Sequence, residues 1–428
     1  MQESEAGRWR GGRRSRASLA LGYSSKPQLT VTPPPPASPL PQRVAYFHSE
    51  RCAQLADVAL ASACPERSAL GHALVAAYVP ELAHTSYPPA TVDQLRRYHT
   101  DSYIQALADP GEQSGEELEA AGLAYDCSPF SDCLLYARLV AGGSLAAAHA
   151  LRAGACDVAI HWDGGRHHAQ RDKASGFCYV NDVVLAVQRL RARRDAGGER
   201  SFRRVMVVDV DIHHCDAVAD AFAATDAVLV ISAHKHQRGF FPGTGSPGDT
   251  GTGRGRGHTL NLALGDGLSD ATFVPLMSSL ISQAAAIYAP DCTVLTCGCD
   301  GLAGDPLGGW CLTPNALAEV ALLCAAGCPA RPLLVLGGGG YDVANTARAW
   351  AVVTAALTGA RDSKDALLHG IQVPDHDHLL RYGPTFAMWD ATQAAHLVPD
   401  ANAQAEALAR LQEDVAALVA ALAAEYEA

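Results

Sequence analysis

Residues 204–216 read RVMVVDVDIHHCD, a short apolar run that ends in alternating acids and histidines. The run is apolar almost throughout, which is typical of a β-strand covered on both faces. In an extended chain, Asp209, Asp211 and His213 point to one side. Charges at the end of a buried strand must be paired or bound to metal. Carboxylates and imidazoles suit zinc or another divalent first-row ion. The alternative is a buried polar cluster whose members satisfy one another.

Similar apolar runs recur along the chain and alternate with longer helical patterns. The predicted strands are Asp157–Trp162, Arg204–Val210, Ala227–Ser232, Cys292–Cys297 and Pro332–Leu336. The predicted helices include Asn181–Arg194, Ser269–Ala289, Pro314–Ala326 and Asn345–Leu357. This alternation predicts the α/β class, with one domain over residues 43–400 and a central, mainly parallel, doubly wound sheet flanked by helices. Ligands bind beyond the carboxyl ends of such strands, so the chemistry should follow each strand directly.

The composition narrows the class of protein. The chain has 428 residues, 48% of them hydrophobic, and a formal net charge of -12. This charge argues against a direct nucleic-acid binder. An acidic surface would attract a lysine-rich partner, although solubility alone explains acidity equally well. Thirteen cysteines at irregular spacings, with no CxxC pair, indicate free thiols in a reducing compartment. No apolar run is expected to span a bilayer, so no membrane insertion is expected.

Both ends of the chain differ from the middle. Residues 1–42 carry six Lys/Arg against two acids and end near a run of four prolines, which predicts a disordered leader. The alternative is an organelle transit peptide, against which the two acids argue. Residues 401–428 place apolar side chains at helical spacing, which predicts an amphipathic helix packed on the domain. A partner-binding helix is the alternative.

A second polar cluster follows the predicted strand Cys292–Cys297. Residues 297–306 read CGCDGLAGDP. An aspartate in a glycine-rich loop is ordinarily a turn or cap residue. However, Asp300 directly follows a core strand, and catalytic zinc commonly has three protein ligands and an open place for water. Asp211, His213 and Asp300 meet that count. Cys297 and Cys299 are weaker rival ligands.

Two further segments offer groups for proton transfer and oxyanion binding. Residues 163–168 read DGGRHH, and Asp209 and Asp216 are available to orient the two histidines. Such pairs supply a general base and an electrostatic partner, although a lone His-His is more often an exposed loop. Residues 336–341 read LGGGGY. Four glycines could cradle phosphate, but no complete phosphate-binding pattern is present. They also allow close backbone approach, which leaves Tyr341 to bind a developing oxyanion.

Together these segments resemble the histone deacetylase family, most closely its class I members, within the arginase/deacetylase fold. The match is ordered from about residue 43 to residue 359 and includes GFCYVND at 176–182 and FFPGTG at 240–245. The resemblance implies a zinc-dependent protein lysine deacetylase, a histone deacetylase that hydrolyses the acetyl amide of N6-acetyl-lysine by metal-activated water.

The resemblance also assigns roles to single residues. The implied ligands of zinc, or of ferrous iron, are Asp211, His213 and Asp300. The implied catalytic residues are His167, His168, Asp209, Asp216 and Tyr341. The implied substrate-binding residues are Asp126, Gly176, Phe177, Phe241, Leu307, Gly339 and Tyr341. Arg67 is implied in an internal cavity through which acetate leaves. Within this set His168 is the main general base and proton donor.

Further implications of the resemblance concern ions, partners and location. One structural K⁺ site would use Asp209, Asp211, His213, Ser232 and Ala233. Another would use Phe222, Thr225, Val228 and His258. The implied partners are acetylated histone tails or other acetyl-lysine proteins and a corepressor complex, without direct nucleic-acid or membrane contact. The implied location is the nucleus, with the cytoplasm as a second compartment.

Some positions depart from the family pattern. Cys215 and Ala217 stand where glycines are usual, which questions the local backbone geometry. Arg166 stands near the channel where an aromatic residue is common, and His258 replaces a common tyrosine. We also hypothesise that Cys127 and Cys178 form a redox-sensitive disulfide.

Two other functions fit the same fold. One is a catalytically inactive corepressor scaffold, against which the complete set of ligands and catalytic residues argues. The other is an acetylpolyamine or small-molecule amidohydrolase. Asp126 matches the family's rim acid for a peptide backbone and argues against that second alternative.

Overall fold

The computed structural model describes residues 43–193, 198–327, 330–360, 371–389 and 398–427. A sheet of eight strands in the order β2-β1-β3-β8-β7-β4-β5-β6 runs through its centre, and all neighbouring strands are parallel. The strands are β1 (Val44–Phe47), β2 (His84–Thr85), β3 (Val158–His161), β4 (Val205–Asp209), β5 (Val228–Lys235), β6 (Thr259–Leu264), β7 (Cys292–Thr296) and β8 (Leu333–Leu336).

The predicted α/β class with a parallel, doubly wound sheet is confirmed. The five predicted strands correspond to β3, β4, β5, β7 and β8, which form one uninterrupted block of the sheet with β6, β1 and β2 at its margins. Those three marginal strands were not predicted. β2 has only two residues, and β6 (TLNLAL) mixes polar with apolar residues because it lies at the edge of the sheet.

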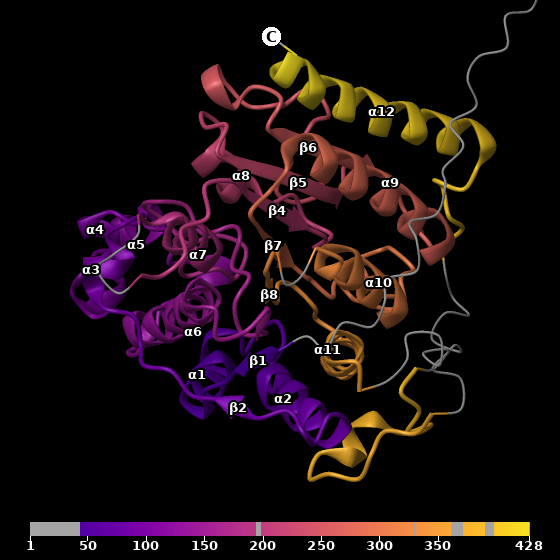
Figure 1. Cartoon of the computed structure of the whole chain (residues 1–428). Helices are drawn as coiled ribbons and strands as arrows, with labels where there is room; N and C mark the ends of the chain where they lie inside the picture. The colour runs from indigo at the N-terminus through magenta and orange to yellow at the C-terminus, as the bar shows by residue number, and fades with distance from the viewer. Residues whose placement is uncertain (1–42, 194–197, 328–329, 361–370, 390–397, 428) are drawn as a thin grey trace, which may run out of the picture. The chain divides into compact units, whose positions relative to one another are not determined.

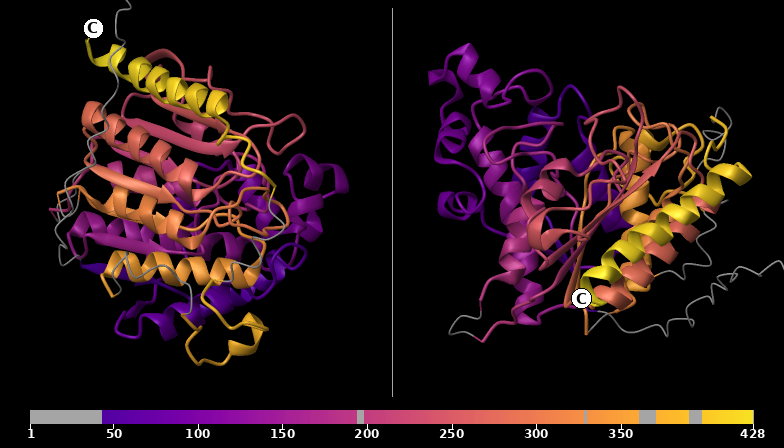
Figure 2. Two further views of the ribbon diagram at one scale, coloured as in Figure 1. Left: turned by 90° about the vertical axis from the view of Figure 1, so that its right-hand side faces the viewer. Right: turned by 90° about the horizontal axis from the view of Figure 1, so that it is seen from above.

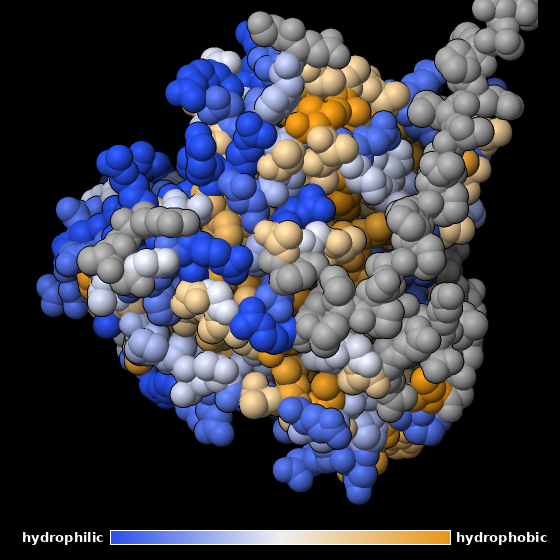
Figure 3. Space-filling view, viewed as in Figure 1, coloured by the Kyte–Doolittle hydropathy of each residue, from blue (hydrophilic) through white to orange (hydrophobic). Residues whose placement is uncertain are grey.

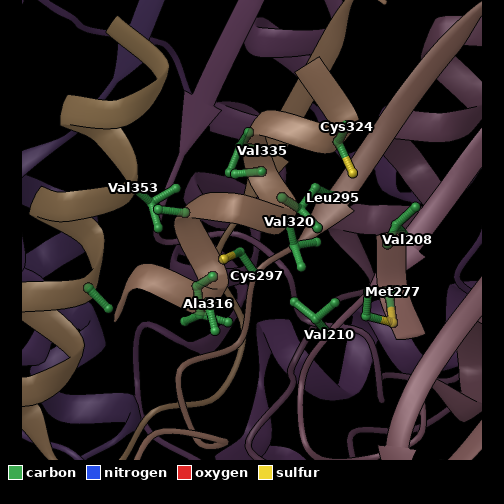
Figure 4. Close-up of a cluster of buried hydrophobic side chains, with 14 of the residues drawn as sticks. Val208, Val210, Met277, Leu295, Cys297, Ala316, Val320, Cys324, Val335 and Val353 are labelled. Carbon is green, nitrogen blue, oxygen red and sulfur yellow. The ribbon is translucent and has the colours of Figure 1, made fainter. Parts of the chain in front are cut away.

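Continuous apolar strands fit this sheet because helices cover both of its faces. In β4, Val205 and Val207 enter one core, whereas Met206 and Val208 enter the other. Figure 4 shows the second core, where Val208 meets side chains of β7, β8 and the helices above them. A strand with two buried faces shows no polar alternation, which is the pattern that the sequence displays.

The helices lie in two layers, one on each side of the sheet (Figure 2). One layer holds α2 (Arg67–Tyr78), α9 (Asp270–Tyr288), α10 (Pro314–Ala325), α11 (Val343–Thr358) and α12 (Ala405–Glu427). The other holds α1 (Glu50–Ala59), α3 (Val92–Leu95), α4 (Asp101–Ala108), α6 (Cys133–Ala153), α7 (Asp182–Arg191) and α8 (Asp216–Phe222). The predicted helices correspond to α7, α9, α10 and α11, within a few residues at each end.

The short helix α5 (Gly115–Ala120) has no buried residue. Hydrophilic side chains cover the region of α3, α4 and α5, at the left of Figure 3. The helix α5 therefore contributes a mainly solvated surface, whereas α3 and α4 also bury side chains in the core on their side of the sheet.

The C-terminal helix α12 packs on α9 and β6 (Figure 1). Its apolar stripe is buried in the core through Leu411, Val415, Leu418 and Leu422. The predicted leader, residues 1–42, lies outside the described residues.

Within the described residues, two helices reach the length and hydropathy of a membrane span, so the expectation that no apolar run does so is wrong on those criteria. They are α6 and α9, with 67% and 44% of the apolar window buried. Both helices contribute several side chains to the two cores. Core packing therefore accounts for much of their apolar composition.

Candidate active site

The three predicted metal ligands meet at the carboxyl edge of the sheet. Asp211 and His213 follow β4, and Asp300 follows the neighbouring strand β7. His213 Nδ1 lies 3.1 Å from Asp211 Oδ1 and 3.0 Å from Asp300 Oδ2. One ligand atom from each residue lies within 4.8 Å of the others, and all three residues are buried. The parallel topology therefore joins residues that are almost ninety positions apart in the chain.

Glycines allow the backbone to approach these carboxylates closely. Gly339 N donates to Asp211 Oδ2 at 2.6 Å. A Cβ at Gly339 would lie 2.1 Å from Asp300 Oδ2, and a Cβ at Gly298 would lie 2.2 Å from Asp211 Oδ2. A side chain at either position would displace a ligand. The glycine run thus serves close approach and not phosphate binding.

Asp211 and Asp300 are buried carboxylates with ligand atoms within 4.8 Å of each other. Two negative charges buried this close together require positive charge nearby. Burial, and then the Asp211 carboxylate, raise the pKa of Asp300 to about 7. Burial opposes the charged form of His213, but its hydrogen bonds to Asp211 and Asp300 raise its pKa to about 10. A divalent ion supplies more positive charge than one proton does, and two carboxylates with one imidazole suit such an ion. The residues present therefore fit a divalent metal.

His167 and His168 lie beside the metal ligands on the loop after β3. Asp209 Oδ2 lies 2.9 Å from His167 Nδ1, and Asp216 Oδ1 lies 2.7 Å from His168 Nδ1. Burial opposes the charge on His167, but Asp209 and other acids raise its pKa to about 9. Burial and the neighbouring His167 lower the pKa of His168 to about 4. The two histidines therefore differ in their readiness to hold a proton, as an acid/base pair requires.

Aromatic side chains stand at the mouth of the site. The Phe241 ring centroid lies 4.8 Å from that of His168, and the Phe177 ring centroid lies 5.5 Å from that of Tyr341. Phe241 and Leu307 are 41% and 43% exposed, so they mark the outer opening. This arrangement gives an apolar entrance above polar catalytic groups.

The predicted rim acid contacts this entrance through the backbone. Gly176 N donates to Asp126 Oδ2 at 2.7 Å. Asp126 lies in the short 3₁₀ turn Tyr125–Cys127. The hydrogen bond fixes the carboxylate beside Phe177 and leaves Oδ1 without a hydrogen bond among the described residues.

Tyr341 follows the glycine run after β8 and lines the same cavity as His167, His168 and His213. Asp305 Oδ2 accepts from the backbone N of Tyr341 at 2.7 Å and from that of Asp342 at 3.2 Å. Asp305 therefore holds the backbone of a residue that lines the cavity.

Two arginines, Arg67 and Arg166, line the cavity. Arg67, on α2, donates through Nη1 to the carbonyls of Gly338 and Gly340 at 3.2 and 3.1 Å. Arg166 also lines the cavity, is 5% exposed, and its Nε has no hydrogen-bond partner among the described residues. A buried guanidinium without a full set of acceptors favours an anion beside it.

The residues of the implied potassium sites fall into two places. Asp209 pairs in register with Ser232 across β4 and β5, and Ala233 follows directly, so the first set is contiguous. For the second set, Thr225 N donates to the Phe222 carbonyl at 3.1 Å, close to the start of β5. His258 offers its carbonyl to Val230 N at 2.9 Å. Potassium binding at either place stays a prediction.

Cys215 and Ala217, which stand where the family usually has glycine, do not strain the local backbone. Cys215 has φ -76°, ψ 59°, a conformation that needs no glycine, and Ala217 lies inside α8. Cys127 and Cys178 are buried free thiols, with Cys127 Sγ 4.0 Å from the Cys178 carbonyl oxygen. A disulfide between them stays a prediction.

One positioning residue was missed by the sequence analysis. Asp182 is fully buried and accepts from Gly165 N at 3.0 Å, Arg166 N at 2.7 Å and Ser144 Oγ at 2.5 Å. It thereby fixes the loop that carries His167. Its sequence signal was the acidic residue at the end of the GFCYVND motif, but an acid is common in the first turn of a helix, so this signal did not reveal its burial.

Comparison with known proteins agrees with this geometry. A histone deacetylase domain matches residues 62–357. The chain is 37% identical to histone deacetylase 8 of Xenopus tropicalis over 348 residues, which cover 80% of this chain and 89% of the relative. It is 38% identical to histone deacetylase 8 of Danio rerio over 81% of this chain and 88% of the relative. It is 35% identical to histone deacetylase RPD3 of Saccharomyces cerevisiae over 81% and 77%.

The matched domain contains the predicted metal ligands, both histidines and the glycine run with its tyrosine. With relatives of this similarity along four fifths of its length, the chain belongs to the histone deacetylase family.

Proposed function

We propose that this chain is a zinc-dependent lysine deacetylase that hydrolyses the acetyl amide of N6-acetyl-lysine in proteins, histone tails among them. One observation carries the proposal: Asp211 and His213 line a single cavity with His167, His168 and Tyr341. Asp300 completes the ligand set, with its Oδ2 3.0 Å from His213 Nδ1. Zinc at these ligands would polarise the acetyl carbonyl and lower the pKa of a water molecule.

The chain's own residues then divide the remaining work. His168, with Nδ1 held by Asp216, has Nε2 available to take a proton from water and to pass it to the departing lysine amine. His167, raised in pKa by Asp209, supplies positive charge beside the reacting carbonyl. The Tyr341 hydroxyl donates to the carbonyl oxygen as negative charge develops on it.

The entrance selects a long, apolar side chain that ends in an amide. Phe177 and Phe241 enclose the lysine methylenes and exclude water. Asp126 Oδ1 accepts from the substrate backbone, because Oδ2 already accepts from Gly176 N. A peptide substrate uses both features, whereas an acetylpolyamine has no backbone amide for Asp126. We further propose nuclear residence, a corepressor partner and the two K⁺ sites, all by likeness to the family.

Turnover of an acetyl-histone peptide beside an acetylpolyamine, with metal-loaded and chelator-treated protein, tests this function. We expect kcat/KM for the peptide to exceed that for the polyamine by at least about 10-fold, and chelation to abolish both activities until zinc is restored. Preference for the polyamine would support the small-molecule amidohydrolase. Absence of any metal-dependent turnover would support the scaffold.

A second prediction concerns product binding at the arginines of the cavity. Acetate released by the reaction carries one negative charge, which Arg166 can bind through a charge-assisted hydrogen bond. Replacing Arg166 with methionine should raise the inhibition constant of sodium acetate about 10-fold at constant ionic strength. Arg171→Met changes an exposed arginine nearby and should leave the constant unchanged. Equal inhibition of wild type and Arg166→Met would remove Arg166 from product binding.

A further inference from the structure

A second group of metal-ligating side chains lies outside the active site. Two sets of three such residues have ligand atoms within 4.8 Å of one another in the described part of the chain. One is the catalytic set. The other consists of His48, His72 and Asp163, and it shares no residue with the first.

The fold brings this second set together at the same edge of the sheet. His48 follows β1, and Asp163 closely follows β3, its neighbour in the sheet. His72 comes from α2, which lies beside β1 and β2 in Figure 1. His84, in β2, is paired in register with Tyr46 of β1. Four elements therefore converge on one point.

The contacts within the set resemble those around a bound ion. His72 Nε2 lies 2.9 Å from Asp163 Oδ2, and the ring centroids of His48 and His72 lie 3.8 Å apart. His72 and Asp163 are each held by a hydrogen bond at the atom that does not face the other residue. Tyr46 Oη lies 2.8 Å from His72 Nδ1. Ser68 Oγ donates to Asp163 Oδ1 at 2.6 Å. Metal ligands are usually oriented by such outer hydrogen bonds.

A plain buried ion pair between His72 and Asp163 explains only part of this arrangement. His48 Nδ1 is buried and has no hydrogen-bond partner among the described residues. An unsatisfied buried polar atom costs about 1–3 kcal/mol. An ion would satisfy the atom that the ion pair leaves alone.

One side of the set, formed by His48 and His72, faces a surface cavity. This cavity of about 410 Å³ is lined by His48, His72 and His84, with the acids Glu50 and Asp57 also on its wall. The acids favour the entry of a cation. The catalytic cavity has a different lining, and the two cavities share no residue.

We propose that His48, His72 and Asp163 bind a second divalent transition-metal ion of the zinc type, with His84 or water completing four ligands. Zinc–nitrogen and zinc–oxygen bonds of about 2.0–2.2 Å place two ligand atoms of a tetrahedral ion roughly 3.3–3.5 Å apart. The separation of His72 Nε2 and Asp163 Oδ2, 2.9 Å, is a few tenths of an ångström shorter. A small opening of this pair therefore admits the ion in place of the shared proton. The bound ion links β1, β3 and α2.

Metal stoichiometry of the full chain tests the proposal. Protein stripped with chelator and dialysed against Zn²⁺ should retain two equivalents, and His48→Ala should retain one. His48→Gln keeps more of the half-buried side chain's volume and should also retain one equivalent. It replaces the alanine variant in the test if that variant does not fold. His149→Ala changes an exposed histidine on α6 and should retain two. Wild type and both His48 variants binding the same number of equivalents would overturn the proposal.

Two further measurements separate this site from the catalytic one. Asp300→Ala should retain one equivalent, and the double variant His48→Ala/Asp300→Ala none. Co²⁺ bound at the second site should give visible absorption bands. These bands should change in the His48 variants and persist in Asp300→Ala. If Asp300→Ala retained two equivalents, the proposed catalytic set would fail while the second site stood. If His48→Ala and wild type gave identical Co²⁺ spectra, the second site would fail alone.

Discussion

Replacement of Asp300 with alanine is expected to lower kcat/KM for an acetyl-lysine peptide by at least about 10³-fold, which corresponds to roughly 4 kcal/mol of transition-state stabilisation. Asp300 is fully buried, lies 3.0 Å from His213 Nδ1, and belongs to the only described set of ligands that lines the catalytic cavity. Loss of one of three protein ligands should release the zinc and with it the polarisation of the carbonyl. Steady-state kinetics with the zinc-loaded protein measure the effect.

The control for this variant must separate lost metal from lost structure. Asp300 Oδ1 also accepts from Ile212 N at 2.9 Å, so its removal leaves a buried donor unsatisfied. Thermal unfolding of Asp300→Ala should therefore be compared with its metal content. Asp377→Ala removes an exposed aspartate far along the chain and should leave both activity and metal content unchanged. A folded Asp300→Ala protein with near-normal turnover would disprove the assigned ligand set.

The second large effect is expected for Tyr341→Phe. This change removes one hydroxyl and keeps the ring that lies beside Phe177. Removal of a single donor from an oxyanion site lowers kcat by about 10²–10³-fold. KM should change little, since the hydroxyl stabilises charge that develops only in the transition state. Separate determination of kcat and KM checks this expectation.

A matched variant is Tyr426→Phe on α12, which loses a hydroxyl 3.1 Å from His258 Nε2 and lies away from the catalytic cavity. It should retain full activity. A rise in KM with unchanged kcat in Tyr341→Phe would instead assign Tyr341 to ground-state binding of the substrate.

The sequence predicted those strands that are buried on both faces, because such strands form an uninterrupted run of apolar residues. β4 and β8 are covered on both faces, so β8 is apolar throughout and β4 is apolar up to its last residue, Asp209. β2 has two residues, too few for a pattern to stand out, and only the last two of the four residues in β1 are buried. The long helix α6 was not predicted either. It is rich in alanine and glycine and is apolar on most sides, because it packs between the sheet and other helices.

The predicted metal ligands were accessible to sequence reasoning because they follow the ends of two neighbouring strands, β4 and β7. Asp211, His213 and Asp300 stand where a parallel sheet collects its ligands. Residues whose side chains accept hydrogen bonds from a backbone segment were harder to recognise in the sequence than the predicted metal ligands. Asp305 and Asp182 act through backbone N–H groups, which no side-chain pattern encodes. The set of His48, His72 and Asp163 needed the register of β1 against β3, which single-sequence patterns do not supply.

The position of β8 has a consequence for how the chain is made. β8 is the last strand in sequence, yet it lies between β3 and β7 in the sheet. During synthesis, β1 to β3 and β4 to β7 emerge as two groups with no strand in common, each with an uncovered edge. Only when residues 333–336 have left the ribosome can the groups join. Such late, long-range pairing is slow. We therefore expect nascent chains that end before β8 to aggregate most readily and to depend most on chaperones.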